Sequence, residues 1–440
     1  MQKGTKYEPG DPLRPNRFFP VVALIYFGIG SLPTWGYTLG LGLDDVDLTG
    51  LWTLIVVGLL AYLIGIKFGG RKREADVTPT ALGGAISIAR EGQRSILFAS
   101  FAVLVGGLAT YAGYKMNGFI PIFADNVDEA RFFFKTPPYV GPLYSLNVVA
   151  AAFTTLTIMR NRRMSPRMVF AGILLAANVF LIIALGSRTG LLFALGCPIL
   201  AYSYLVKRLT LRRLAVFALV GFLGFSFLSV LRNSGGINGV SGWLETQDAF
   251  FLGSPYLSLI YEPPRFTLET MQVFFENIPN PIPPFHGAFI GVEFLTLLPG
   301  FKVNANMLTI FFFDSVGLWA ESGRPPGIFG VGYADFLLPG VIVYLLSWGL
   351  VLGKSYRRLV ARPGLRRAFV HSFLLLWLTF GLYGMGIPNV EFFVELSIFV
   401  VAAEYISARS QNTPMSWVAR GFVLLLTIVG VSSSIYQLVS

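Results

Sequence analysis

The stretch PRMVFAGILLAANVFLIIALGSRTGLLFALGCPILAYSYL, residues 166–205, decides the fold class. It holds two apolar runs, near 168–186 and 190–206, which are joined by the short connection ALGSRTGLL at 184–192. Each run is long enough to cross about 30 Å of hydrocarbon as a helix. A helix also satisfies its backbone N–H and C=O groups internally, as a lipid surrounding requires. The stretch therefore predicts two membrane helices that turn back on each other in a tight hairpin.

Apolar runs of similar length recur along the rest of the chain. Of the 440 residues, 54% are hydrophobic and 13% are charged, and that charged share is about half of what soluble proteins carry. The alternating pattern of a β-barrel is absent. The sequence predicts an all-α polytopic membrane protein with about 11 transmembrane helices in a single transmembrane domain, residues 1–440. The other expected spans lie near 18–38, 51–69, 95–114, 140–159, 214–231, 332–353, 368–386, 390–407 and 419–437.

The distribution of charge predicts the orientation of the chain. The formal net charge is +11, and most of the 34 Lys and Arg residues fall on alternate connections between spans. Most of the 23 Asp and Glu residues fall on the other connections. The positive-inside rule then places the N-terminus in the cytoplasm and the C-terminus outside. Because orientation explains the basic balance, no nucleic-acid partner is expected.

Two long connections are expected on the outer face, and function is expected there. The first outer loop covers 116–139. The second, at 232–331, is the longest connection in the protein, and loops of that length are commonly functional. Short interfacial or re-entrant helices are expected within it, near 249–260, 287–299 and 306–313, because these apolar stretches are too short to span.

Arginines on the outer face suggest a site for phosphate. Arg188 lies in the tight hairpin, at the membrane rim, where a charge is costly and is usually paired or functional. A planar guanidinium suits phosphate oxygens, although a snorkelling interfacial arginine would look the same in the sequence. Arg265 and Arg324 each adjoin a proline pair, which either holds the arginine rigidly or forms an ordinary turn on a solvated loop.

Carboxylates accompany these arginines. Asp125, Asp128 and Glu129 precede Arg131 within seven residues, and they either stabilise a short helix or form a site that handles a hydroxyl proton beside a phosphate. Glu391 and Glu395 share one helix face near the outer end of a span. They suit a proton path, a proton acceptor or a partner for an arginine.

Other chemistries find little support. His286 is the only histidine of the outer loops and is either a general base or an ordinary surface residue. With one cysteine and two histidines, the chain offers no metal site, and none of the phosphate-loop, Rossmann, zinc-protease or nucleophile-elbow motifs occurs. No cofactor is expected. An outward site rich in arginine and carboxylate at membrane depth suits a lipid-diphosphate-linked sugar.

Four segments together resemble the Wzy-type O-antigen (oligosaccharide repeat-unit) polymerases. In the last of them, Gly330, Tyr333 and Asp335 occupy familiar places, but Val331 replaces a glutamate that often follows the glycine in that family. The segments are GFIPIFADNVDEARF at 118–132, LGSRTGLL at 185–192, LTLLPGFKVNANML at 295–308 and RPPGIFGVGYADFLLPG at 324–340.

The resemblance implies a GT-C-like, metal-independent glycosyltransferase of the bacterial cytoplasmic membrane. Its substrate would be an undecaprenyl-diphosphate-linked oligosaccharide, and the growing glycan would pass from its lipid onto the next lipid-linked repeat. By this resemblance Arg131, Arg188 and Arg324 face phosphate, while Asp125 and Asp128 lie beside the sugar. A chain-length regulator and a flippase are candidate partners, besides membrane lipid. The alternatives are an O-antigen ligase, which would rely on an outer-loop histidine, a lipid-linked glycan transporter, and a scaffold without chemistry.

Overall fold

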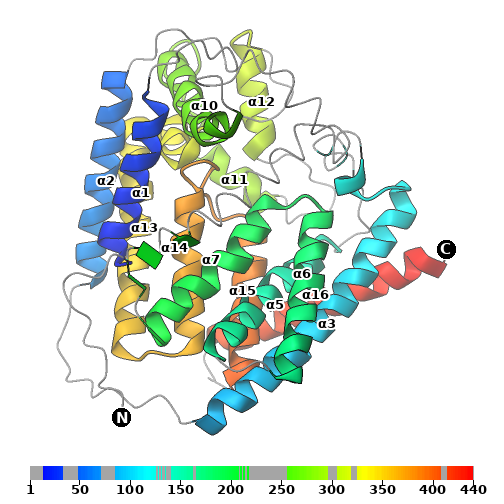
Figure 1. The fold of residues 1–440 in the computed structure, drawn as a ribbon. Coiled ribbons are helices and arrows are strands. Elements are labelled where there is room, and N and C mark those ends of the chain that lie inside the picture. Colours follow the sequence, from blue (N-terminus) through cyan, green and yellow to red (C-terminus); the bar gives the residue numbers. More distant parts are fainter. Residues whose placement is uncertain are drawn as a thin grey trace.

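The computed structural model confirms the all-α class over the residues that it describes (Figure 1). These residues are 13–32, 48–70, 85–124, 140–161, 165–207, 255–295, 305–318, 325–407 and 414–439, with short pieces at 127, 130, 134, 209–210, 212–213 and 216–217. Six helical stretches in these ranges are long and apolar enough to cross a membrane: Leu48–Gly70, Arg90–Asn117, Leu143–Arg160, Pro166–Ala184, Gly327–Ala361 and Trp417–Leu438. The chain is thus a multi-pass membrane protein. Most of the span expected at 214–231 lies outside the described residues.

Among the described residues, ten helices form the main bundle. They are α1 (Pro15–Gly30), α2 (Leu48–Gly70), α3 (Ala85–Asn117), α5 (Gly141–Arg160), α6 (Pro166–Ala184), α7 (Arg188–Leu205), α13 (Gly327–Ala361), α14 (Leu365–Phe380), α15 (Val390–Ser407) and α16 (Pro414–Val439). Helix α5 lies in the middle and contacts α3, α6, α7 and α15. Small residues on α5 make this close packing possible, because Ala150, Ala151 and Ala152 are all fully buried.

Helices α2 and α13 pack backbone to backbone through glycines. A Cβ atom on Gly65 would lie 2.3 Å from the carbonyl oxygen of Leu346, and one on Gly349 would lie 2.2 Å from that of Tyr62. Gly69 and Gly353 are equally crowded by the opposite helix. Each helix therefore carries a glycine pair four residues apart, the spacing that lets two membrane helices approach closely.

Three further helices form a layer over one end of the bundle, at the top of Figure 1. They are α10 (Pro255–Asn277), α11 (Ala288–Leu295) and α12 (Ala305–Ser315), and we call them the cap layer. Helices α11 and α12 agree with the short helices expected in the 232–331 loop. Helix α10 is longer than the short helix expected near 249–260, and Pro263 and Pro264, for which a rigid placement and an ordinary turn were both left open, lie inside its 23 residues. Its side chains bond to the start of the chain: Tyr26 to Thr267 (2.9 Å) and Tyr261 to the carbonyl of Leu32 (3.0 Å).

The tight hairpin predicted between α6 and α7 is confirmed. Gly186 adopts a positive φ of 65°, its N–H donates to the Ile183 carbonyl (2.7 Å), and the Ser187 N–H donates to the Ile182 carbonyl (3.2 Å). Glycine is favoured here because it adopts the left-handed conformation that ends a helix without steric cost. We call the end of the bundle that holds residues 185–188 the hairpin end. The opposite end, where α13 is followed by α14 through Arg362, is the basic end.

Candidate functional site

A pocket of about 400 Å³ opens at the hairpin end between α5, α6, α7 and α15, and we call it the hairpin pocket. The start of α5, the end of α6, the connection to α7 and the first turns of α15 form its walls. Its polar lining consists of two carboxylates, two serines and a tyrosine. The lining residues are Gly141, Tyr144, Ser145, Val148, Leu181, Ile182, Leu185, Ser187, Val390, Glu391, Val394 and Glu395.

Glu395 is the most informative residue of this pocket. Its side chain is only 2% exposed, and its Oε2 atom has no hydrogen-bond partner among the described residues. Burying a carboxylate oxygen without a hydrogen-bond partner is costly, and a ligand or a bound proton would offset that cost. Glu391 lies one turn earlier on the same face and is exposed at the pocket. The predicted pairing of these two carboxylates on one helix face is thus confirmed.

Helix α15 begins in a way that fixes these carboxylates. The Asn389 side chain accepts a hydrogen bond from the backbone N–H of Phe392 (2.9 Å), which is the geometry of an N-terminal cap. Aromatic packing holds the next turn, because the ring of Phe392 lies 5.0 Å from that of Trp377 and 5.4 Å from that of Phe373. The first two turns of α15, and with them Glu391 and Glu395, are therefore well anchored.

Arg188 is the first residue of α7, directly beside the pocket. The preceding residue, Ser187, lines the pocket, and its hydroxyl accepts a hydrogen bond from the Gly190 N–H (3.1 Å) as the cap of the helix. The side chain of Arg188 lies outside the described residues. The backbone start of α7 contributes the positive end of a helix dipole at this wall. Chain topology thus brings the predicted arginine position and the two predicted glutamates to one pocket.

Described neighbours of the predicted cluster of the first outer loop adjoin the same hairpin. Ile122 and Val127 pack against Ala184, the last residue of α6. A short 3-10 helix, η1 (Pro121–Phe123), contacts α6 as well. Asp125, Asp128, Glu129 and Arg131 lie outside the described residues, so the structure fixes only the path of their neighbours. That path follows the end of α6, beside the hairpin.

A second polar arrangement lies where α13 is broken. Phe336 (φ −144°, ψ 25°) and Leu337 (φ 58°, ψ −149°) leave the helical conformation, and the fully buried Asp335 directly precedes them. Its carboxylate accepts from the Tyr344 hydroxyl (2.5 Å) and from the Phe289 N–H (3.3 Å). The exposed His286 donates its backbone N–H to the Asp335 carbonyl (2.9 Å). Asp335 thus ties the cap layer to α13.

The remaining predicted residues take separate positions. Arg265 is buried in α10, and its Nε lies 2.8 Å from Oε1 of Glu269, which is buried too. Tyr333 donates its hydroxyl to the Ile278 carbonyl (3.0 Å) at the end of α10. Arg324 lies outside the described residues. Among the described residues, no group of three or more His, Cys, Asp or Glu side chains comes together.

Sequence reasoning missed several residues that build these sites. Ser187 and Asn389 act as helix caps, and both signals were present in the sequence as a polar residue directly before an apolar run. Tyr144 and Tyr344 gave no such signal, since each looks like an ordinary residue of a span. His371 is fully buried, and its Nδ1 lies 3.0 Å from the Ser355 hydroxyl.

Comparison with known proteins gives no relative. The chain matches no family model, no curated protein and no solved structure. Any functional reading therefore depends on the hairpin pocket and the residues around it.

Proposed function

We propose that this protein is a membrane glycosyltransferase that polymerises lipid-diphosphate-linked oligosaccharide repeat units for a surface polysaccharide such as O-antigen, capsule or exopolysaccharide. The observation that carries the proposal is the hairpin pocket. It combines a buried carboxylate whose Oε2 atom has no hydrogen-bond partner among the described residues, a second carboxylate one turn away, and the N-terminus of α7 with Arg188 as its first residue. The resemblance of four sequence segments to Wzy-type polymerases supports the same reaction.

The proposed chemistry assigns one role to each wall of the pocket. The N-terminus of α7 and the Arg188 guanidinium bind the diphosphate, because helix N-termini and arginines both favour phosphate oxygens. Neutralising this charge makes the lipid diphosphate a leaving group. Glu395 or Glu391 accepts the proton of the acceptor hydroxyl as that oxygen attacks the sugar carbon. Arg131 and Arg324 remain candidates for additional phosphate contacts.

The proposed setting is the bacterial cytoplasmic membrane, with the hairpin end facing outward. The fold would be GT-C-like with about eleven spans, the N-terminus inside and the C-terminus outside, in agreement with the distribution of basic residues. The basic end, with Lys354, Arg358, Arg366 and Arg367, would then face the cytoplasm. A lipid-linked substrate would reach the hairpin pocket from the outer leaflet.

Two other functions each have one observation in their favour. A ligase that moves the finished glycan onto a different acceptor would use an outer histidine. His286 is exposed and lies beside the break in α13. A transporter of lipid-linked glycan would use a discontinuous helix, and α13 is discontinuous at Phe336 and Leu337.

Gene deletion followed by complementation tests the proposal. The host gene is deleted, and surface glycans are separated by size on a gel. Complementation then uses wild type, Glu395→Gln and the control Glu276→Gln, which changes an exposed glutamate of the cap layer. A polymerase predicts that deletion leaves a single repeat unit attached and no ladder. Wild type and the control should restore the ladder, whereas Glu395→Gln should not, at equal protein levels.

Each rival predicts a different gel. Loss of a ligase leaves no repeat attached, while long lipid-linked polymer accumulates. Loss of a transporter removes polymer and lets lipid-linked single repeats accumulate on the inner face. A ladder restored fully by Glu395→Gln would refute the role of the hairpin pocket even if the deletion itself abolishes polymerisation.

A further inference from the structure

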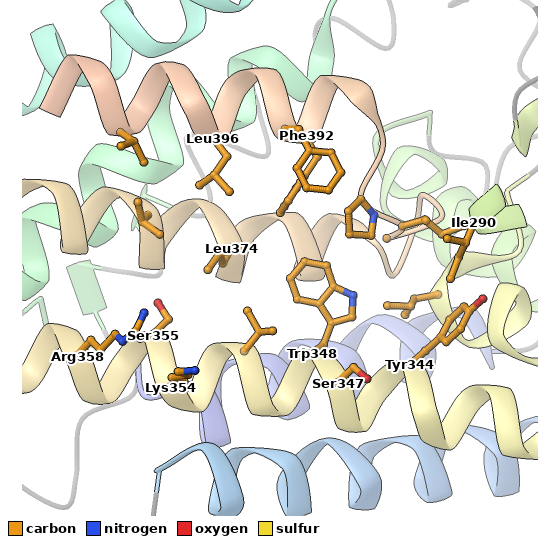
Figure 2. Close-up of a pocket in the computed structure, with 18 of the residues that line it drawn as sticks. Ile290, Tyr344, Ser347, Trp348, Lys354, Ser355, Arg358, Leu374, Phe392 and Leu396 are labelled. Carbon is orange, nitrogen blue, oxygen red and sulfur yellow. The ribbon is translucent and has the colours of Figure 1, made fainter. Parts of the chain in front are cut away.

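A second and larger cavity lies away from the hairpin pocket. It is a groove of about 670 Å³ between α13, α14 and α15, and we call it the α13–α15 groove (Figure 2). Along α13 its lining extends from Val343 to Arg358. At about 1.5 Å per residue these fifteen steps span roughly 22 Å, about two thirds of the hydrocarbon core of a bilayer. The groove is therefore long enough to cover most of the thickness of the hydrocarbon core.

The middle of the groove is apolar. Figure 2 shows Trp348, Leu374 and Phe392 arranged around the same space from three different helices. Leu396 and Val400 continue the apolar wall along α15, and Ile290 of the cap layer lies at the far end, beside Tyr344. A hydrocarbon chain fits such a wall, because burial of apolar surface is the only strong interaction that the wall offers to a ligand.

One end of the groove is strongly basic. Lys354 and Arg358 of α13 and Arg366 and Arg367 of α14 line it, and no residue of the lining is acidic. The adjacent carboxylate of Glu404 is held by Arg366 (2.8 Å) and by Arg420 (2.7 Å). Lys354 and Arg358 are exposed at the groove. The Ser355 hydroxyl lines the groove between them. The positive charge thus lies at the end of an apolar channel.

We propose that the α13–α15 groove is a binding site for one anionic phospholipid from the leaflet at the basic end. The phosphate lies between Lys354, Arg358 and Arg367, and one acyl chain runs along Trp348 toward Ile290. Charge complementarity selects this occupant. A zwitterionic lipid would bring its own cation to the cluster. The tail of a lipid carrier whose diphosphate sits at the hairpin end would add no negative charge beside Lys354, Arg358 and Arg367. The site is separate from the hairpin pocket and does not depend on the proposed reaction.

Native mass spectrometry of the full-length protein tests the site. Purified protein is titrated with phosphatidylglycerol or with phosphatidylcholine of the same acyl chains. The test variant is Lys354→Gln/Arg358→Gln/Arg367→Gln, which retains Arg366 and hence its ion pair with Glu404. The matched control is Lys207→Gln/Arg212→Gln/Arg213→Gln, which removes the same charge from exposed residues that do not line the groove. Thermal unfolding shows that each variant is folded.

The expected result is one tightly bound phosphatidylglycerol in wild type and control, and affinity weakened by about a hundredfold in the test variant. Equal affinity of test variant and wild type for phosphatidylglycerol would overturn the proposal. Binding of phosphatidylcholine as tight as that of phosphatidylglycerol would overturn it too.

Brominated acyl chains give a second readout, because bromine quenches tryptophan fluorescence on contact. We expect phosphatidylglycerol with brominated chains to quench wild type more than Trp348→Phe. A polyprenyl diphosphate serves as competitor. If it displaces the bound lipid and binds the test variant as tightly as wild type, the groove holds the tail of a lipid carrier instead. If the test variant does not fold, Lys354→Gln/Arg358→Gln, which alters only exposed side chains, replaces it with the same criteria.

Discussion

The Tyr344 hydroxyl donates a 2.5 Å hydrogen bond to the Asp335 carboxylate across the break in α13. The two residues lie on opposite sides of Phe336 and Leu337, so this bond joins the two halves of the helix. The Phe289 N–H donates to the other carboxylate oxygen (3.3 Å). One carboxylate therefore holds both the break and the start of α11.

We predict that Asp335→Ala destabilises the protein by about 2–4 kcal/mol, because the buried Phe289 N–H and the half-buried Tyr344 hydroxyl both lose their acceptor. Tyr344→Phe should cost less, about 1–3 kcal/mol, because one oxygen of the carboxylate keeps its bond to Phe289. Thermal unfolding in detergent measures both. Asp314→Ala, which changes an exposed carboxylate on α12, is the control and should have little effect. A loss for Asp314→Ala as large as that for Asp335→Ala would show that the break is not held in this way.

Ser187 gives a prediction that links helix geometry to the proposed site. Its hydroxyl caps α7, and Arg188 is the next residue. Ser187→Ala should destabilise the start of α7 by about 1 kcal/mol. The polymer ladder should also weaken, because Arg188 is then held less firmly. Ser187→Asn supplies another good cap and should restore both properties. Loss of the ladder in Ser187→Asn at normal stability would instead mean that the serine hydroxyl itself contacts substrate.

The sequence predicts those parts of the fold whose signal lies in neighbouring residues of the chain. Length and apolarity alone predicted α2, α5 and α6. The glycine and serine of LGSR predicted the hairpin, because helix ends have local signatures. The break in α13 falls at Phe336 and Leu337, directly before Pro339, and a proline removes the helical hydrogen bond to the carbonyl four residues earlier, here that of Asp335. This local signal was present in the sequence, but the expected span at 332–353 ran through it. The partner that the Asp335 carbonyl takes instead, the His286 N–H next to the cap layer, is distant in the sequence and has no local signal.

The candidate site shows the same limit. The sequence predicted Arg188, Glu391 and Glu395 as separate candidates, each from its own surroundings. That the start of α7 and the start of α15 share one pocket follows from packing around α5, which no local pattern encodes. Arg265 shows the limit from the other side. Its proline pair left a rigid placement and a turn on a solvated loop equally open. Helix α10 continues through the pair, and the arginine forms a buried ion pair with Glu269.

The glycine contacts between α2 and α13 predict two substitutions of opposite sign. Gly349→Ala places a Cβ 2.2 Å from the Tyr62 carbonyl oxygen, so the helices must separate, and we expect a loss of about 2 kcal/mol or more. Gly172→Ala in α6 meets no heavy atom within 4 Å. It should be neutral or stabilising by up to about 1 kcal/mol, since alanine favours the helix. Thermal unfolding of the two variants in one detergent measures the difference. Equal effects would argue against close packing at this interface.

Glu293 of α11 predicts a pH dependence within the cap layer. Its Oε1 accepts a hydrogen bond from the Ala305 N–H (3.0 Å) at the start of α12. Burial raises the pKa of the Glu293 carboxyl, and this hydrogen bond only partly opposes the shift. The folded state binds the proton of the Glu293 carboxyl more tightly than the unfolded state does. The contribution of this protonation to the free energy of unfolding is therefore fully present at pH values below the ordinary carboxyl pKa. It is lost as the pH rises through the raised pKa.

Glu293→Gln keeps an oxygen acceptor for Ala305 but cannot ionise. We therefore expect its melting temperature to equal that of wild type near pH 4 and to exceed it near pH 8. Glu276→Gln, which changes an exposed glutamate of the same layer, should show no such divergence between the two pH values. Glu293→Ala should be destabilised at both, by about 1 kcal/mol or more, because the Ala305 N–H loses its partner. The opposite result would be a melting temperature of wild type that rises relative to that of Glu293→Gln as the pH increases. The folded state would then have to stabilise the ionised form of Glu293. The carboxylate would then join α11 to α12 as an anion, and the pH dependence would have the opposite sign.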